Sequence, residues 1–184
     1  MKSRNWKDVS YLKSGSLKQK KVYKLLKTSG TLKILSDYNP LLVGTIPIEI
    51  DTENSDIDIV CEVYNFAKFE DILKENFNKY KHFKLRYKKR NIIICNFWID
   101  SFEVEIYGTN NKSEKSDGYR HMIVESRILS LYGNDFKKKV IQLKKEGIKT
   151  EPAFARLLNL KGNPYEELLL FENYTDEEIE NIKF

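Results

Sequence analysis

The sequence predicts an α+β fold, in which a mixed β-sheet flanked by helices is followed by a C-terminal helical region. Short apolar stretches with strand-like alternation are confined to residues 40–107, and every periodic segment after residue 118 is helical. This order is typical of a sheet layer covered by helices, with a helical group packed on it. We therefore expect a sheet-containing core over residues 1–108 and a helical region over residues 109–184.

Composition places the chain among globular proteins. Of its 184 residues 41% are hydrophobic, and 11 tyrosines and 10 phenylalanines exclude a disordered chain. No stretch approaches the roughly 18 apolar residues that span a bilayer, and residues 1–7 lack the apolar core of a signal peptide. Cys61 and Cys95 lack metal-ligand spacing and are expected to be buried thiols of a cytoplasmic protein. The net charge of +5 favours phosphates or nucleic acid without requiring either.

Helical periodicity begins near the N-terminus. Residues 16–28 are predicted to form a helix, with Ser16 as its N-cap and Gly30 just past its end. A shorter helix is expected at residues 5–12. Residues 40–44 predict a buried strand that closes on a glycine turn.

The sheet is expected to continue after a loop at residues 46–54. Four further strands are predicted at residues 56–63, 82–88, 91–98 and 101–107. An amphipathic helix at residues 65–80 separates the first of these from the rest. Tight polar connections indicate that the last three pair as antiparallel hairpins.

The polar segment 109–118 predicts a mobile loop, and helices are expected beyond it. The predicted helices lie at residues 119–131, 135–146, 152–160, 164–172 and 176–183. Thr150 is expected to cap one of them, with Pro152 in its first turn. Four aromatic residues are expected in the core, although one of them could stack on a nucleobase: Phe97, Trp98, Tyr107 and Phe154.

The chemistry centres on Asp56 and Asp58. Alternate side chains of a strand face the same way, so these two carboxylates project side by side. Such close carboxylates repel each other unless a cation lies between them, and oxygen-only ligands favour Mg²⁺ or Mn²⁺. Upstream, Gly44 and Thr45 offer backbone amides and a hydroxyl to phosphate oxygens.

A third carboxylate is expected on a neighbouring strand. Glu103 and Glu105 share one face of the strand at residues 101–107 if Phe102, Val104 and Ile106 face the core. Alternation alone does not choose between the two glutamates.

These motifs resemble the nucleotidyltransferases related to DNA polymerase beta, whose signature is Gly-[Ser/Thr], a spacer, and Asp-apolar-Asp. The resemblance is closer to a bacterial family of that superfamily, domain of unknown function 4269, and covers nearly the whole chain. Its pattern appears in the segments at residues 42–48, 55–59, 102–108, 119–125, 147–155 and 162–165.

The resemblance implies roles for individual residues. Asp56 and Asp58 would be metal ligands, and Gly44, Thr45 and Ser55 would contact the nucleotide. Glu105 is the preferred third ligand and catalytic acid, because it lies nearest the strand end before a turn expected at Gly108. Two departures from the family pattern are threonine for the commoner serine at position 45 and glutamate for the usual third aspartate.

Three polar residues of the predicted helix 119–131 have two interpretations. Arg120 and Arg127 could reach a triphosphate, with His121 as an acid, a base or a stacking group. The same residues could instead tie the helical region onto the sheet through ion pairs. Both interpretations stand at this point.

The resemblance implies a metal-dependent nucleotidyltransferase that moves a nucleoside monophosphate from a nucleoside triphosphate to an acceptor hydroxyl. The acceptor would be a small molecule, a protein or an RNA. Two alternatives are a nucleotide-binding module without turnover and a toxin–antitoxin-type protein that modifies a protein or tRNA. Neither the acceptor, the preferred base nor the oligomeric state follows from the sequence.

Overall fold

The computed structural model describes residues 4–184, so Met1–Ser3 of the N-terminal segment considered above lie outside it. The chain forms two compact units. The first comprises the residues up to Glu49 together with Ser55–Tyr119, and the second comprises Ile50–Asn54 together with Arg120–Phe184. Among the described residues, no helix combines the length and apolar character that a bilayer span requires.

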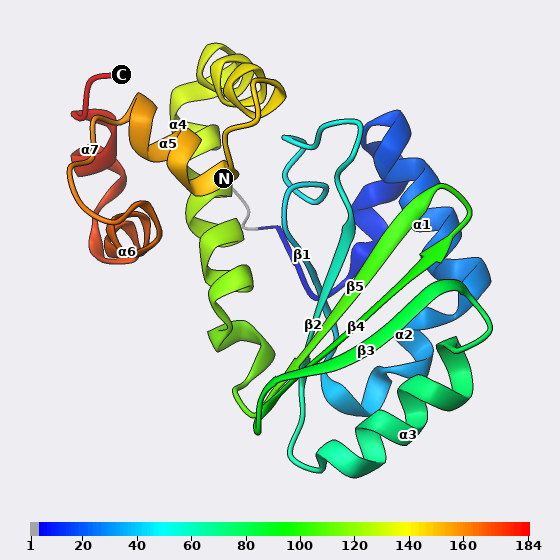
Figure 1. Cartoon of the computed structure of the whole chain (residues 1–184). Helices are drawn as coiled ribbons and strands as arrows, with labels where there is room; N and C mark the ends of the chain where they lie inside the picture. The colour runs from blue at the N-terminus through cyan, green and yellow to red at the C-terminus, as the bar shows by residue number, and fades with distance from the viewer. Residues whose placement is uncertain (1–3) are drawn as a thin grey trace. The chain divides into compact units, whose positions relative to one another are not determined.

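The first unit is built on a mixed five-stranded sheet, as predicted (Figure 1). Its strands are β1 (Leu41–Val43), β2 (Ile57–Glu62), β3 (Lys81–Lys89), β4 (Ile92–Ile99) and β5 (Phe102–Thr109). In space they follow the order β1-β2-β5-β4-β3. Strand β2 runs parallel to β5, and the other neighbouring pairs are antiparallel, including the two predicted hairpins.

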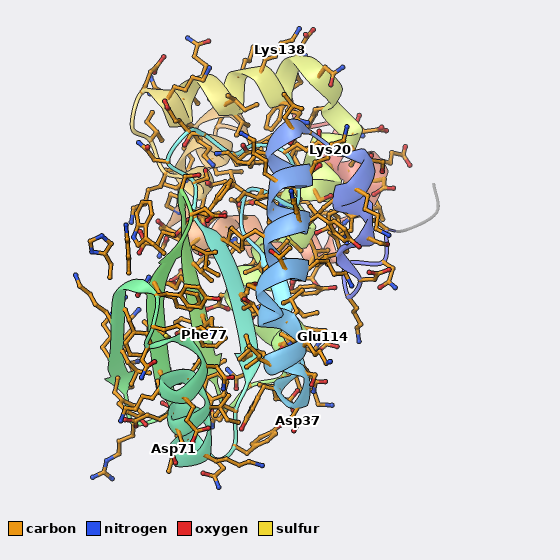
Figure 2. All side chains as sticks on the ribbon, turned by 90° about the vertical axis from the view of Figure 1, so that its right-hand side faces the viewer. Lys20, Asp37, Asp71, Phe77, Glu114 and Lys138 are labelled. Carbon is orange, nitrogen blue, oxygen red and sulfur yellow. The ribbon has the colours of Figure 1, made fainter. Side chains whose placement is uncertain are left out.

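The helical elements of the first unit are η1 (Val9–Ser14), α1 (Leu17–Ser29), α2 (Thr31–Ile34), η2 (Ser36–Tyr38), α3 (Phe66–Phe77) and η3 (Ser113–Lys115). Of these, α1 and α3 lie on one side of the sheet and cross in front of the strands in Figure 2. Ser16 caps α1 by accepting from the Gln19 amide, and Gly30 ends it at a φ of 68°, as predicted.

The helix expected at residues 5–12 is instead the 3₁₀-helix η1. Its start is set by Asp8, whose carboxylate accepts from the Ser10 amide and occupies the N-cap position. The sequence did not predict α2 and η2, because these short turns after Gly30 have no helical periodicity of their own.

The core lies between the sheet and these helices. The sheet contributes Leu42, Ile57, Ile59, Cys61, Ile93, Cys95, Phe97, Val104 and Ile106, and α1 and α3 contribute Val22, Leu25, Leu26, Phe69, Leu73 and Phe77. Both cysteines are buried free thiols, as expected. Phe77 stacks on Phe97 at a ring-centroid distance of 4.7 Å, which ties α3 to β4.

Gly108 does not form the turn expected after Glu105. It lies within β5, paired with Ile93 on β4 and Cys61 on β2. A Cβ atom at this position would come within 2.7 Å of the Phe69 ring. Gly108 therefore serves close packing of α3 on the sheet, which a sequence pattern cannot distinguish from a turn.

The second unit is helical. Its elements are α4 (Asp117–Lys145), which begins in the first unit, α5 (Thr150–Leu157), α6 (Pro164–Leu170), η4 (Phe171–Asn173) and α7 (Asp176–Glu180). Gly133 has a φ of 72° and divides α4, which confirms the two helices predicted on either side of it. The expected loop 109–118 is partly wrong, because β5 extends to Thr109, η3 follows, and α4 begins at Asp117. Thr150 is the first helical residue rather than the cap of α5, since Lys149 occupies the N-cap position.

Candidate functional site

A row of polar residues crosses the sheet on the side opposite the core. Asp58 on β2 pairs in register with Glu105 on β5, and Glu105 pairs with Asn96 on β4. Asn96 in turn pairs with Lys84 on β3. Because paired residues of neighbouring strands project to the same face, the side chains of all four belong to one surface. Val104 and Ile106 are buried in the core, which confirms that Glu103 and Glu105 face outward together.

Gly44 lies directly against Asp58. Strand β1 ends at Val43, which pairs with Asp58, and Gly44 follows with a φ of +78°. A Cβ atom on Gly44 would lie 2.3 Å from Oδ2 of Asp58. Both the positive φ and this close approach require glycine, so the backbone after β1 can lie beside the aspartate carboxylate.

Thr45 and Ser55 are linked through their side chains. The Thr45 hydroxyl donates to Oγ of Ser55 at 3.2 Å. This hydrogen bond joins the residue after Gly44 to the residue before Asp56, across ten positions of sequence. The structure thus brings the two halves of the Gly-Thr and Ser-Asp-Ile-Asp motifs together at one end of β1 and β2.

A cleft of about 530 Å³ opens on the polar face of the sheet. Its lining residues are Asp56, His82, Lys84, Arg86, Asn96, Trp98, Glu103 and Glu105. The acids come from β5 and the start of β2, whereas the basic residues come from β3. A surface that places acidic and basic residues side by side can hold a cation and its anionic ligand together.

Asn96 and Arg86 connect the two sides of this cleft. The Asn96 amide donates to Oε1 of Glu103 at 3.1 Å and to Oε2 of Glu105 at 3.2 Å. Arg86 donates to the Asn96 carbonyl oxygen and lies 3.6 Å from Oε2 of Glu105. These contacts fix both glutamates over the same patch of sheet.

Tyr107 lies two residues beyond Glu105 on the same face of β5. Burial, together with the negative charges of Asp117 and Glu105, raises the pKa of the Tyr107 hydroxyl. The group therefore stays neutral at physiological pH and keeps its proton as a hydrogen-bond donor.

The donors present fit a hard divalent cation. Asp56, Asp58 and Glu105 offer carboxylate oxygens from two adjacent parallel strands, and Asp58 and Glu105 are direct register partners. Oxygen-only donors of this kind suit Mg²⁺ or Mn²⁺. Register places Glu105, rather than Glu103, directly opposite Asp58, and its role as the third acid stays a prediction.

Sequence reasoning missed the basic and aromatic part of the cleft. His82, Lys84 and Arg86 alternate with Phe83 and Leu85, which pack against the core. That alternation was present in the sequence and would have placed the three basic residues on the outer face.

Trp98 was expected in the core and is instead 38% exposed in the cleft. It alternates with the buried Phe97, so β4 turns the tryptophan to the outer face. Its ring meets His82 edge to face at 6.2 Å. Phe97 and Phe154 are buried as expected, and Tyr107 is half-buried.

Arg120 and Arg127 form ion pairs inside the second unit. Arg120 donates twice to Glu172, at 2.9 and 2.7 Å, and Arg127 lies 2.6 Å from Asp176 and also donates to two main-chain carbonyls. These ion pairs join α4 to η4 and α7 of the same unit, whereas the structural interpretation expected ion pairs to the sheet. A role in nucleotide binding stays a prediction for them.

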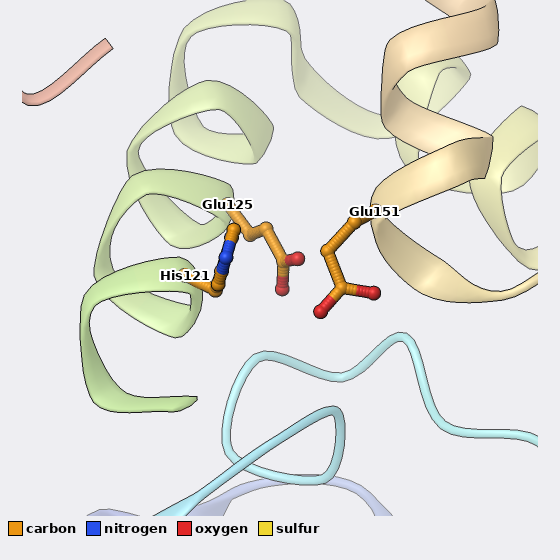
Figure 3. Close-up of side chains that lie close together, drawn as sticks. All are labelled: His121, Glu125 and Glu151. Atoms are coloured by element: carbon orange, nitrogen blue, oxygen red, sulfur yellow. The ribbon is translucent and has the colours of Figure 1, made fainter. Parts of the chain in front are cut away.

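His121 is buried at 6% exposure and also belongs to the second unit. Its ring lies in a group with Glu125 and Glu151 (Figure 3). A contact of His121 with nucleotide likewise stays a prediction.

Solved structures show the same fold. The Cid1 poly(U) polymerase with bound Mg 3′-dATP is 16% identical and matches with a TM-score of 0.59 over 88% of this chain and 53% of its own. A cytoplasmic RNA terminal U-transferase is 18% identical, with a TM-score of 0.54 over 84% and 48%. The GLD-2/RNP-8 complex is 17% identical, with a TM-score of 0.53 over 76% and 56%. The chain thus spans about half the length of these structures.

Sequence comparison gives a family rather than an activity. A comparison with curated proteins finds no match. The model of the family described as "Domain of unknown function (DUF4269)" matches residues 24–171, most of the chain. The chain therefore belongs to the DUF4269 family and has the fold of nucleotidyltransferases related to DNA polymerase beta.

Proposed function

We propose that this protein is a metal-dependent nucleotidyltransferase that transfers a nucleoside monophosphate from a nucleoside triphosphate to an acceptor hydroxyl. One observation carries the proposal: Asp58 and Glu105 are register partners on adjacent parallel strands, with the Gly44 backbone packed against Asp58. Two acids on neighbouring strands beside a phosphate-binding turn are what phosphoryl transfer requires.

Asp56, Asp58 and Glu105 would hold Mg²⁺ or Mn²⁺. Such an ion neutralises the phosphates and lowers the pKa of the attacking hydroxyl. Amides at Gly44 and Thr45, with the linked Thr45 and Ser55 hydroxyls, would bind phosphate oxygens.

The proposed reaction is an attack of the acceptor hydroxyl on the α-phosphorus of the nucleoside triphosphate. The acceptor oxygen forms a bond to the α-phosphorus, and the bond between the α-phosphorus and the bridging oxygen breaks, releasing pyrophosphate. Glu105 takes the hydroxyl proton as general base. Lys84 and Arg86, on the basic side of the cleft, would balance charge on the phosphates.

The basic side of the cleft favours an RNA end as acceptor, ahead of a small molecule or a protein. Trp98 and His82 offer ring surfaces next to Lys84 and Arg86. Aromatic surfaces beside cationic side chains bind single-stranded nucleotides through base stacking and phosphate contacts. The solved structures of this fold include proteins named as a poly(U) polymerase and an RNA terminal U-transferase, which supports the same choice.

A nucleotide-binding module without turnover is the second candidate. Glu105 accepts from Asn96 and faces Arg86 at 3.6 Å, so its charge is partly balanced already. If these contacts persist with nucleotide bound, they would occupy the Glu105 carboxylate and hinder its transfer of the acceptor's proton.

Pyrophosphate release separates the two candidates. The full chain is incubated with each of the four labelled nucleoside triphosphates, Mg²⁺ or Mn²⁺, and an RNA oligonucleotide ending in a 3′-hydroxyl or in a 3′-deoxy nucleotide. We expect release and label transfer only with the 3′-hydroxyl RNA, and we expect Asp58→Asn to lower both about a thousandfold. Asp71→Asn is the matched control, because Asp71 is exposed on α3, on the core side of the sheet (Figure 2).

Other results would redirect the proposal. Release that needs a protein or small molecule in place of RNA would keep the chemistry and change the acceptor. Nucleotide-dependent thermal stabilisation without release, under every metal and acceptor, would establish the binding module and contradict the transferase.

A further inference from the structure

A second group of potential metal ligands lies within the C-terminal unit. His121 and Glu125 are four residues apart on α4, and Glu151 lies in the first turn of α5 (Figure 3). One ligand atom from each of the three lies within 4.8 Å of the other two. Positions i and i+4 of a helix share one face, so α4 supplies two donors and α5 the third.

Burial separates this group from ordinary surface acids. His121 is 6% exposed and Glu125 only 3%, whereas Glu151 is half-buried. A carboxylate this deep normally has its oxygens hydrogen-bonded, because an unpaired buried charge costs several kcal/mol. Oε1 of Glu125 is nevertheless buried and has no hydrogen-bond partner among residues 4–184.

Glu151 and Lys144 are the charged groups that act on Glu125. Burial and the charge of Glu151 raise its pKa, and Lys144 acts in the opposite direction. As Figure 3 shows, the carboxylates of Glu125 and Glu151 face each other. Two acids in that arrangement need a cation or a shared proton between them.

We propose that His121, Glu125 and Glu151 form a structural site for a divalent transition-metal ion, with Zn²⁺ as the preferred occupant. The ion would join α4 to α5 within the second unit. It is distinct from the cation expected at the sheet, which belongs to the first unit.

Ligand chemistry decides the choice of metal. One imidazole nitrogen and two carboxylate oxygens form a mixed set, which suits zinc better than Mg²⁺ with its preference for oxygen and water. Zinc ligands lie about 2.0–2.2 Å from the ion, so tetrahedral ligand atoms are roughly 3.4 Å apart. The ligand atoms, all within 4.8 Å of one another, would therefore have to approach by at most about 1.4 Å.

Neighbouring residues support the site. The Tyr165 ring meets His121 edge to face at 6.1 Å and orients the imidazole. Glu151, less buried than the other two, leaves a side on which water can complete the coordination.

The test measures zinc bound by the full chain. Protein freed of metal with a chelator is incubated with zinc chloride in excess Mg²⁺, desalted, and analysed for zinc by elemental analysis. We expect about one zinc per chain and a thermal midpoint about 5–10 °C higher with zinc at roughly 100 times its dissociation constant. Asp58→Asn should bind zinc like the wild type, because it alters only the sheet.

Two variants of the proposed ligands and one control variant test which residues bind the zinc. Glu125→Gln keeps the shape of the side chain, so it should fold as a metal-free protein and lose both the bound zinc and the thermal shift. His121→Gln should lose them too. Glu177→Gln, a change of an exposed acid on α7 of the same unit, should leave them unchanged.

Two outcomes would overturn the site. One is a wild-type chain that binds less than about a tenth of an equivalent of zinc while Glu125→Gln is equally or more stable, since a shared proton then fills the space. The other is zinc binding that survives Glu125→Gln and disappears in Asp58→Asn, which would place the ion at the sheet. Neither outcome contradicts nucleotidyl transfer at the sheet, so the two proposals fail separately.

Discussion

The acids of the sheet and the acids of the C-terminal unit are arranged in opposite ways. Glu103 and Glu105 lie on an open cleft, and Asn96 donates to both of them. Glu125 is almost fully buried and has an oxygen without a hydrogen-bond partner among the described residues. The first group is built on strands in fixed register, and the second joins two helices.

This difference matches the two proposed roles, a catalytic metal site at the sheet and a structural metal site in the C-terminal unit. A reacting metal and its nucleotide must enter and leave, which suits an open, solvated cleft with oxygen ligands. A structural ion stays in place, which suits a closed group with a nitrogen ligand. We therefore expect substitutions at the sheet to change turnover, and substitutions in the C-terminal cluster to change stability.

Asp58→Asn should have the largest effect. Removing one charge from the metal ligands costs several kcal/mol of transition-state stabilisation, and each 1.4 kcal/mol or so is tenfold in rate. Turnover in the pyrophosphate assay should fall about a thousandfold, with the thermal midpoint unchanged or raised. An equal fall in Asp71→Asn would mean that the loss is unspecific.

Glu105→Gln and Glu103→Gln sharpen the assignment of the third acid. Only Glu105 pairs in register with Asp58, so we expect about a hundredfold loss of kcat for Glu105→Gln, the range for general-base catalysis. Glu103→Gln should change kcat by less than about threefold. If the two results were reversed, register would be the wrong guide to the catalytic acid.

Gly44→Ala tests the backbone that lies against Asp58. A non-glycine residue at a φ of +78° costs about 1–3 kcal/mol, and its Cβ would also displace the Asp58 carboxylate. We expect a comparable drop in unfolding free energy by urea titration and about a tenfold loss of turnover. Gly133→Ala is the matched control, because Gly133 has a φ of +72° with nothing near the added Cβ, so only stability should fall.

Glu125→Gln should have the smallest effect on catalysis. Its removal leaves the sheet unchanged, so turnover per folded chain in Mg²⁺ should stay within about twofold of wild type at 25 °C. Its effect should appear only in the zinc-dependent thermal shift. A loss of turnover in this variant would break the separation between the two regions.

Local patterns in the sequence sufficed for much of this fold. Caps at Ser16 and Gly30 bounded α1, and alternation located the strands and the outward face of Glu103 and Glu105. Contacts between residues far apart in the sequence have no local pattern and were not predicted. Gly108 was mistaken for a turn because the Phe69 ring that needs its missing side chain comes from α3.

The candidate site was predictable only along single strands. Asp56 and Asp58 are two residues apart, so their common face follows from strand alternation. The pairing of Asp58 with Glu105 depends on the register between β2 and β5, which the local sequence of neither strand determines. The Glu125 cluster depends on how α4 meets α5, so His121 was noticed without Glu151.

The most direct test is an anomalous difference map from crystals grown with Mn²⁺ and a non-hydrolysable nucleoside triphosphate. We predict a manganese peak held by Asp56 and Asp58, with Glu105 beside it and the triphosphate at Gly44 and Thr45. A map with manganese elsewhere, or with the two aspartates turned away from the nucleotide, would contradict the proposed site.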